Sequence, residues 1–174
     1  MAFAIVDGYS IRHARGEDIE AFRGLRLEAL KNHPETFGQD YDDAASRDLE
    51  YWENTLKINP KEKALFFAEQ NSQLIGMTGV YRILSKKSHH AATIWGVYVK
   101  PAWRGKHISE TLVRECLGWA KDQQITIVKL AAVTDNLPAV RCYERCGFTI
   151  YGREPKAIHY DGVYYDEYLM ACEI

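Results

Sequence analysis

Residues 130–148 read LAAVTDNLPAVRCYERCGF and join an apolar strand to a short helix. The apolar run 125–133, rich in β-branched residues, is typical of a buried strand. Asn136 follows it in a position to cap a helix. Asn136, Val140 and Tyr143 are spaced at i, i+4 and i+7, so they would share one face of that helix. The stretch therefore predicts a strand–helix unit that presents an amide and a phenol on the same side.

A second stretch, residues 94–113 (IWGVYVKPAWRGKHISETLV), joins an apolar strand to an amphipathic helix that opens at Ile108. A helix start presents unpaired backbone N–H groups and the positive end of the helix dipole. Arg104 and Lys106 add two cations there, and Gly105 allows a ligand to approach the backbone closely. Together these features predict an anion site suited to phosphate or diphosphate. The alternative is a helix that merely begins near basic surface residues. Neither a nucleotide P-loop nor a dinucleotide-binding glycine motif is present.

Hydrophobic periodicity elsewhere predicts a mixed α/β sheet in a single domain over residues 1–174, in the order β-α-α-β-β-β-α-β-α-β-β. A second helix, capped by Ser46, is expected to end at Asn59-Pro60, and residues 34–46 before it to form a loop. Strands are expected over 9–14, 64–70, 74–83, 91–99, 125–133, 148–153 and 163–172, and the other helices over 17–32, from 108, and over 137–146.

The amino-acid composition is that of a globular protein. Hydrophobic residues make up 47%, charged residues 26%, and the formal net charge is −2. This balance is that of a globular protein and points to neither a nucleic-acid nor a membrane partner. Apolar runs are far shorter than the ~20 residues that span a bilayer. The opening MAFAIVDGYS lacks the features of a signal peptide. Four cysteines without a CxxC pair are expected to be core thiols, and no metal site is predicted. We expect a cytoplasmic protein.

Both stretches resemble segments of the GNAT superfamily of N-acetyltransferases. The family's phosphate pattern is Gln/Arg-x-x-Gly-x-Gly/Ala, preceded by an apolar strand and Val-x-Pro. Arg104 matches its first position. His107 stands where glycine is usual, and Ser109 stands where glycine or alanine is usual. The family's next segment is Asn-x-x-Ala-x-x-x-Tyr-x-x-x-Gly-Phe. Every position of it is matched, by Asn136, Ala139, Tyr143, Gly147 and Phe148. The element order also follows the family, so the resemblance covers nearly the whole chain.

The resemblance implies a central splayed sheet flanked by helices, with the pantetheine arm of acetyl-CoA in the gap between the strand ending at Val99 and the strand starting near Ile127. The backbone of Val97, Tyr98 and Val99 would pair with that arm, and one of these N–H groups would polarise the acetyl carbonyl. The diphosphate would lie against Arg104, Gly105, Lys106, His107, Ile108 and Ser109.

The reaction implied is the direct attack of a primary amine on the thioester of acetyl-CoA. Asn136 would lie near the cofactor, and Tyr143 would be the general acid that protonates the departing thiolate. A covalent step on Cys142 is not expected, because neighbouring helical residues point about 100° apart. The general base stays open: the strand 91–99 has no carboxylate. The candidates are His89, His90, Glu28 and Glu167, and some relatives release the proton to solvent.

The acceptor is open as well. Acidic and aromatic residues over 37–53 would suit a polyamine or the amine of a peptide, unless they form an ordinary solvated face. The C-terminal hairpin would form the opposite wall of the acceptor site, where His159, Tyr160, Tyr164 and Tyr165 could line it. The alternative to an enzyme is a non-catalytic acetyl-CoA-binding sensor or assembly subunit. A homodimer is compatible with the resemblance, because many relatives pair through edge strands or hairpins.

Overall fold

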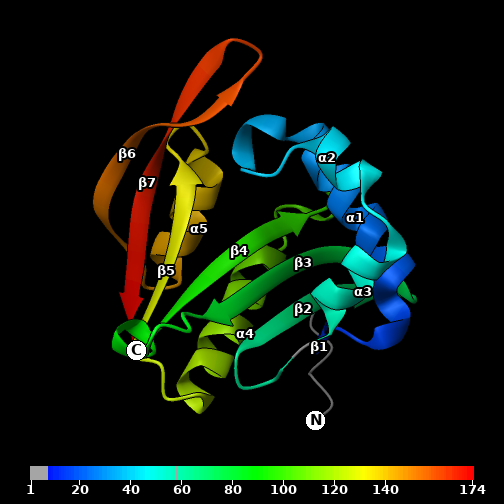
Figure 1. Cartoon of the computed structure of the whole chain (residues 1–174), viewed down its shortest axis with the longest axis horizontal. Coiled ribbons are helices and arrows are strands. Elements are labelled where there is room, and N and C mark those ends of the chain that lie inside the picture. Colours follow the sequence, from blue (N-terminus) through cyan, green and yellow to red (C-terminus); the bar gives the residue numbers. More distant parts are fainter. Residues whose placement is uncertain (1–7, 58) are drawn as a thin grey trace.

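The computed structural model of the chain describes residues 8–57 and 59–174, and its seven strands form one sheet in the order β1-β2-β3-β4-β5-β7-β6 (Figure 1). Neighbouring strands are antiparallel except for the parallel pair β4–β5. The strands are β1 Ser10–His13, β2 Lys63–Gln70, β3 Gln73–Arg82, β4 Ala91–Val99, β5 Ile127–Val133, β6 Thr149–Tyr160 and β7 Val163–Glu173. The predicted mixed sheet is therefore confirmed. The opening residues 1–7, on which the signal-peptide expectation rests, lie outside the described part.

Over the described residues, five α-helices accompany the sheet: α1 Ile19–Asn32, α2 Tyr41–Ser46, α3 Leu49–Leu56, α4 Ile108–Asp122 and α5 Leu137–Arg145. The prediction that Ser46 caps the second helix was wrong, and so was the loop expected over 34–46. Asp40 accepts hydrogen bonds from the backbone N–H groups of Asp42 and Asp43, so α2 begins at Tyr41, within the segment that was expected to be a loop. The cap of α3 is Asp48, whose carboxylate accepts from the Tyr51 N–H at 2.9 Å. Aspartate at either cap supplies the acceptor that a helix start requires.

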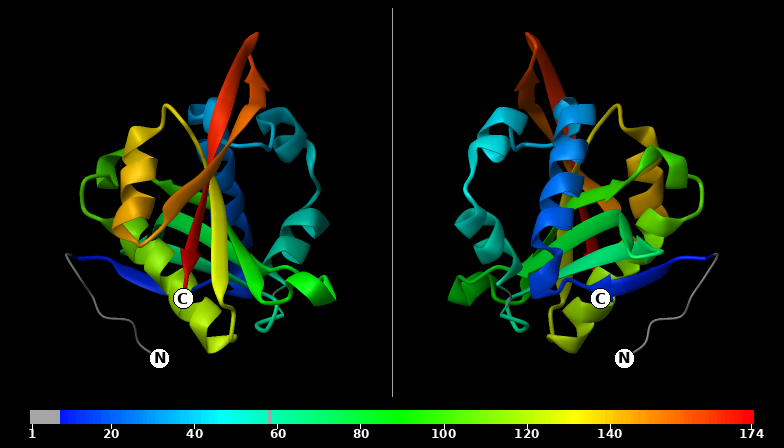
Figure 2. Two further views of the ribbon diagram at one scale, coloured as in Figure 1. Left: turned by 90° about the vertical axis from the view of Figure 1, so that its left-hand side faces the viewer. Right: turned by 90° about the vertical axis from the view of Figure 1, so that its right-hand side faces the viewer.

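The helices divide between the two faces of the sheet (Figure 2). On one face, α1 and α3 pack Phe22 and Trp52 against Phe67, all at most 1% exposed. On the other face, α4 and α5 cover a larger cluster that includes Leu112 and Phe148. Each apolar face thus has its own core, so the strands between them are held from both sides. Within the described part of the chain, no helix combines the length and apolar character needed to cross a membrane.

The sheet opens between β4 and β5, which pair only from Ala91 to Thr93. Beyond Thr93 the two strands diverge. A register shift between β3 and β4 accompanies the divergence, and Gly96 there has a φ of +66°, in the left-handed region that favours glycine. The splayed sheet expected from the sequence is therefore present, and its gap faces the start of α4.

Candidate active site

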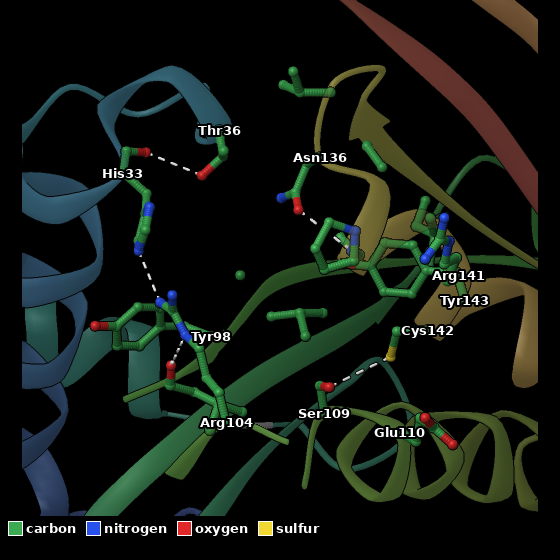
Figure 3. Close-up of a pocket in the computed structure, with 18 of the residues that line it drawn as sticks. His33, Thr36, Tyr98, Arg104, Ser109, Glu110, Asn136, Arg141, Cys142 and Tyr143 are labelled. Carbon is green, nitrogen blue, oxygen red and sulfur yellow. Dashed lines mark hydrogen bonds between the residues drawn. The ribbon is translucent and has the colours of Figure 1, made fainter. Parts of the chain in front are cut away.

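A cleft of about 780 Å³ occupies the gap between β4 and β5 (Figure 3). One wall is β4 over residues 94–99, and the other is β5 over residues 130–133. The first turn of α4 and one face of α5 close one side. His33 and residues 35–37, which follow α1, close the other. The cleft thus extends from the start of α4 to the segment that follows α1.

Ten of the eleven residues that the sequence assigned to the cofactor line this cleft. They are Val97, Tyr98, Val99, Arg104, Gly105, His107, Ile108, Ser109, Asn136 and Tyr143. The exception is Lys106, whose Nζ lies 4.5 Å from the centroid of the Trp103 ring. Because Trp103 itself lines the cleft, the Lys106 charge lies next to the cleft but outside its wall.

His107 takes the conformation that the missing glycine would take. It has a φ of 57° at the start of α4, in the left-handed region that costs an L-residue about 1 kcal/mol or more. Its imidazole turns outward, is 71% exposed, and lies 2.8 Å from Glu110 Oε1. The backbone of the loop is thus kept, and the side chain leaves the helix start open to an anion.

Arg104 points across the mouth of the cleft. Its Nε donates to the Val99 carbonyl at 3.1 Å, and its Nη2 lies 2.8 Å from His33 Nε2 at the end of α1. The guanidinium also stacks over the Tyr98 ring at 5.9 Å. In this arrangement the cation joins the end of β4 to the end of α1 and stays at the edge of the cleft.

Helix α5 presents Asn136 and Tyr143 to the cleft, as the spacing predicted. The Asn136 side-chain oxygen accepts from the Ala139 N–H at 3.3 Å, which confirms the predicted cap. Tyr143 is 7% exposed and packs edge-on against Phe148. Burial raises the pKa of the Tyr143 phenol above its usual range, so the hydroxyl keeps its proton at neutral pH.

The comparison with known families follows from this geometry. The model of the acetyltransferase (GNAT) family matches residues 25–148 of the chain. The chain belongs to this family. Membership makes the protein an N-acetyltransferase, and it confirms both the family expected from the sequence and the prediction of an acyltransferase.

Individual relatives of this GNAT acetyltransferase agree with the assignment. The L-amino acid N-acetyltransferase AaaT of Escherichia coli is 28% identical over 165 residues, which cover 92% of this chain and 95% of AaaT. A GNAT-family acetyltransferase structure from Streptococcus pneumoniae superimposes with a TM-score of 0.85 at 22% identity, covering 95% and 99% of the two chains. The structure of yncA from Salmonella typhimurium, solved with its cofactor acetyl-CoA, has a TM-score of 0.78 at 19% identity and covers 95% of this chain and 93% of its own.

The four candidates for the general base of this GNAT acetyltransferase lie at different positions relative to the cleft. His89 and His90 precede β4, at the end where β4 still pairs with β5, and neither lines the cleft. Glu28, on α1, accepts from the Tyr98 hydroxyl at 2.9 Å and pairs with Lys100 at 3.4 Å. Glu167, on β7, lies opposite Val133, which lines the cleft, but neither Glu28 nor Glu167 is itself a lining residue. Burial, and to a lesser degree Glu154 on the neighbouring strand, raise the pKa of Glu167.

The acidic stretch of the acetyltransferase mostly supports its own helices. Asp40 and Asp48 cap α2 and α3, and Asp43 pairs with Arg47 at 3.0 Å. The carboxylates of these three aspartates are therefore already occupied by partners within the protein, and they do not form a free acidic cluster that would bind a polyamine. On the opposite wall, Tyr165 lines the cleft, whereas Tyr164 is 55% exposed.

Several residues that line the cleft were missed by the sequence reasoning. Arg141, on the exposed side of α5, adds a cation to the wall, and Trp95 adds an aromatic ring. Phe37, which the sequence placed in the acceptor wall, also lines the cleft. Gly96 carried a usable signal, since a glycine inside an apolar strand often marks a bulge. Among the described residues, no three His, Cys, Asp or Glu side chains gather as metal ligands would.

Proposed function

We propose that the protein transfers the acetyl group of acetyl-CoA directly to a primary amine of a small molecule or a peptide, and that residues 1–174 act as one catalytic domain. The observation that carries this proposal is the cleft of about 780 Å³ that brings the unpaired part of β4, the start of α4 and Tyr143 together. The relative AaaT is, by its name, an N-acetyltransferase that acts on L-amino acids.

The residues present fit the cosubstrate. Beyond Thr93, β4 has no β5 partner along this edge, so the backbone at Val97–Val99 is available to pair with an extended amide-bearing arm. The helix start at His107–Ser109 supplies N–H groups for a diphosphate, and Arg104 lies at the same mouth. Acetyl-CoA, when bound, supplies the acetyl group as a thioester.

The chemistry then assigns a task to each side of the cleft. The amine nitrogen bonds to the acetyl carbon, the carbon–sulfur bond breaks, and the amine gives up one proton. A backbone N–H of residues 97–99 polarises the carbonyl as the charge on its oxygen grows. Tyr143 donates its hydroxyl proton to the departing sulfur and regains one from solvent. Glu167 or water accepts the proton of the amine.

The test is acceptor-dependent release of free thiol. Purified protein is incubated with acetyl-CoA and a panel of amino acids, polyamines, aminoglycosides and short peptides. Release that depends on one acceptor class, together with the mass of the acetylated product, supports the proposal. Tight acetyl-CoA binding without release for any amine contradicts it and favours a cofactor sensor.

A further inference from the structure

Arg26, in the middle of α1, carries a charge into the interior. The residue is only 6% exposed. Its guanidinium lies between the rings of Phe37 and Trp95, at 4.9 and 5.8 Å from their centroids. Nε and Nη2 both donate to Gln39 Oε1, at 3.2 and 3.0 Å. The groups in direct contact with this cation are thus two aromatic rings and a neutral amide, and the Tyr51 hydroxyl lies behind that amide at 3.2 Å from Gln39 Nε2.

The Arg26 charge has no counter-ion in the part of the chain that the structure describes. Among the described residues, no aspartate or glutamate forms an ion pair with it. Burial lowers the pKa of Arg26 to about 10, which still leaves the group charged at neutral pH. Buried charges are normally paired, because removing an ion from water is costly. An unpaired buried arginine beside a cleft therefore suggests that a ligand supplies the missing anion.

One edge of the guanidinium is also without a hydrogen-bond partner. Nη1 of Arg26 is shielded from solvent and bonds to no described residue. A Cβ placed on Gly96 would lie 3.6 Å from this nitrogen, so the unused donor faces the β4 bulge. Gly96, Trp95 and Phe37 all line the cleft. Arg26 itself does not line the cleft, so the unsatisfied donor lies behind the part of the wall that these residues form.

This edge lies on the side of the cleft that faces α1. Figure 3 shows His33 and Thr36, which follow α1, across the cleft from Ser109 and Glu110 at the start of α4. Under the proposed function the diphosphate takes the α4 side, which leaves the α1 side to the acceptor. Gly96 directly precedes residues 97–99, one of whose backbone N–H groups polarises the acetyl carbonyl in that proposal. One carbon atom between an amine and a carboxylate would let the two groups reach these neighbouring positions.

We propose that Arg26 selects the acceptor by binding its carboxylate at Nη1, and that the substrate class is α-amino acids. This inference rests on the proposed function and adds the chemistry of the acceptor to it. Because Nη1 is shielded from solvent, binding includes a displacement of the Phe37 ring from the guanidinium. Arg26 is a specificity residue here and takes no part in the transfer of protons or of the acetyl group.

The test compares each of several L-amino acids with its own primary amide, which keeps the amine and side chain but removes the negative charge. Rates of thiol release are expressed per concentration of neutral amine, because the amide is the weaker base. We expect the wild-type kcat/KM to favour the acid by at least about tenfold, as for loss of a hydrogen bond to a buried charged group. Arg26→Met, which keeps an unbranched side chain of similar length, should reduce that ratio to near one and leave the amide rate within about threefold.

Two further variants separate specificity from stability. Arg47→Met removes an arginine that follows α2, is exposed, pairs with Asp43 and does not line the cleft, so the ratio should not change. Arg26→Lys keeps the charge without the planar fork and should give an intermediate ratio. If Arg26→Met does not fold, the wild-type ratio and Arg26→Lys decide the question.

The outcomes distinguish the inference from the function on which it rests. Equal rates for acids and amides, a preference for polyamines, or an unchanged ratio in Arg26→Met would overturn the carboxylate site while acetyl transfer stands. Absence of thiol release with every amine would overturn the proposed function itself, and the carboxylate site with it.

Discussion

Replacement of Tyr143 by phenylalanine removes a single oxygen atom from the cleft. The side chain is 7% exposed, and its ring packs against Phe148 with a centroid distance of 6.2 Å. Phenylalanine keeps that ring contact, so the free energy of unfolding should change by no more than about 1 kcal/mol. Any larger effect on turnover therefore reports the chemistry of the hydroxyl.

The size of that effect follows from the leaving group. A positioned general acid contributes about 10²- to 10⁴-fold to the rate. A thiol has a pKa of about 8.5, so its thiolate is a fair leaving group, and the benefit should be at the lower end. We expect kcat to fall about 100-fold in Tyr143→Phe, which is about 2.7 kcal/mol of transition-state stabilisation. Burial raises the pKa of Tyr143, so the wild-type rate should show no loss from phenol ionisation below about pH 10.

The assay is thiol release at saturating acetyl-CoA and acceptor, with acetyl-CoA affinity measured by calorimetry. The dissociation constant of acetyl-CoA should stay within about threefold, because the ring that lines the cleft is kept. Tyr151→Phe is the matched control, since Tyr151 is 55% exposed on β6 and lies outside the cleft. If Tyr143→Phe retained kcat within about threefold of the wild type, the phenol would not be the acid that the mechanism requires.

Three further changes test the phosphate loop and the buried carboxylate. His107→Gly should raise the free energy of unfolding by up to about 1 kcal/mol in thermal melts, since glycine adopts a φ of 57° without strain while the exposed contact to Glu110 adds little. Arg104→Met should weaken acetyl-CoA binding about tenfold by calorimetry, whereas Lys106→Met, outside the cleft wall, should weaken it less than threefold. Glu167→Gln should raise the melting temperature at pH 7, because burial penalises the ionised carboxylate.

The stability difference between the wild type and Glu167→Gln should depend on pH. The pKa of Glu167 is higher in the folded than in the unfolded chain, so its protonation stabilises the wild type at low pH. That stabilisation is lost as the pH rises through the folded-state pKa, and Glu167→Gln should lack this dependence. A lower melting temperature of the variant at pH 7 would contradict the assignment. Equal losses of affinity in Arg104→Met and Lys106→Met would show that only net charge matters at the loop, and a less stable His107→Gly would show that the imidazole contact outweighs the strain.

Most helices and strands could be predicted because their ends are fixed by interactions between residues close together in the sequence. Asn136 caps α5 through a bond to Ala139, three residues along the chain, and the Asp161-Gly162 turn joins β6 to β7. The helix at Ile108 begins and the strand Ala91–Val99 ends as expected. The cap predicted at Ser46 was wrong because several Asp and Ser residues compete over 40–48, and each of them can accept from a nearby N–H.

The amino-acid sequence by itself determined the family, the order of strands and longer helices, and the residues of the cofactor side, because these depend on short-range periodicity and on motifs of contiguous residues. Tertiary structure alone decided where β4 leaves β5, how Arg104 meets His33, and that Arg26 is buried beside Gly96 with no counter-ion among the described residues. In each of these cases the partners lie far apart along the chain. Their contact depends on how the layers pack, which no local pattern encodes.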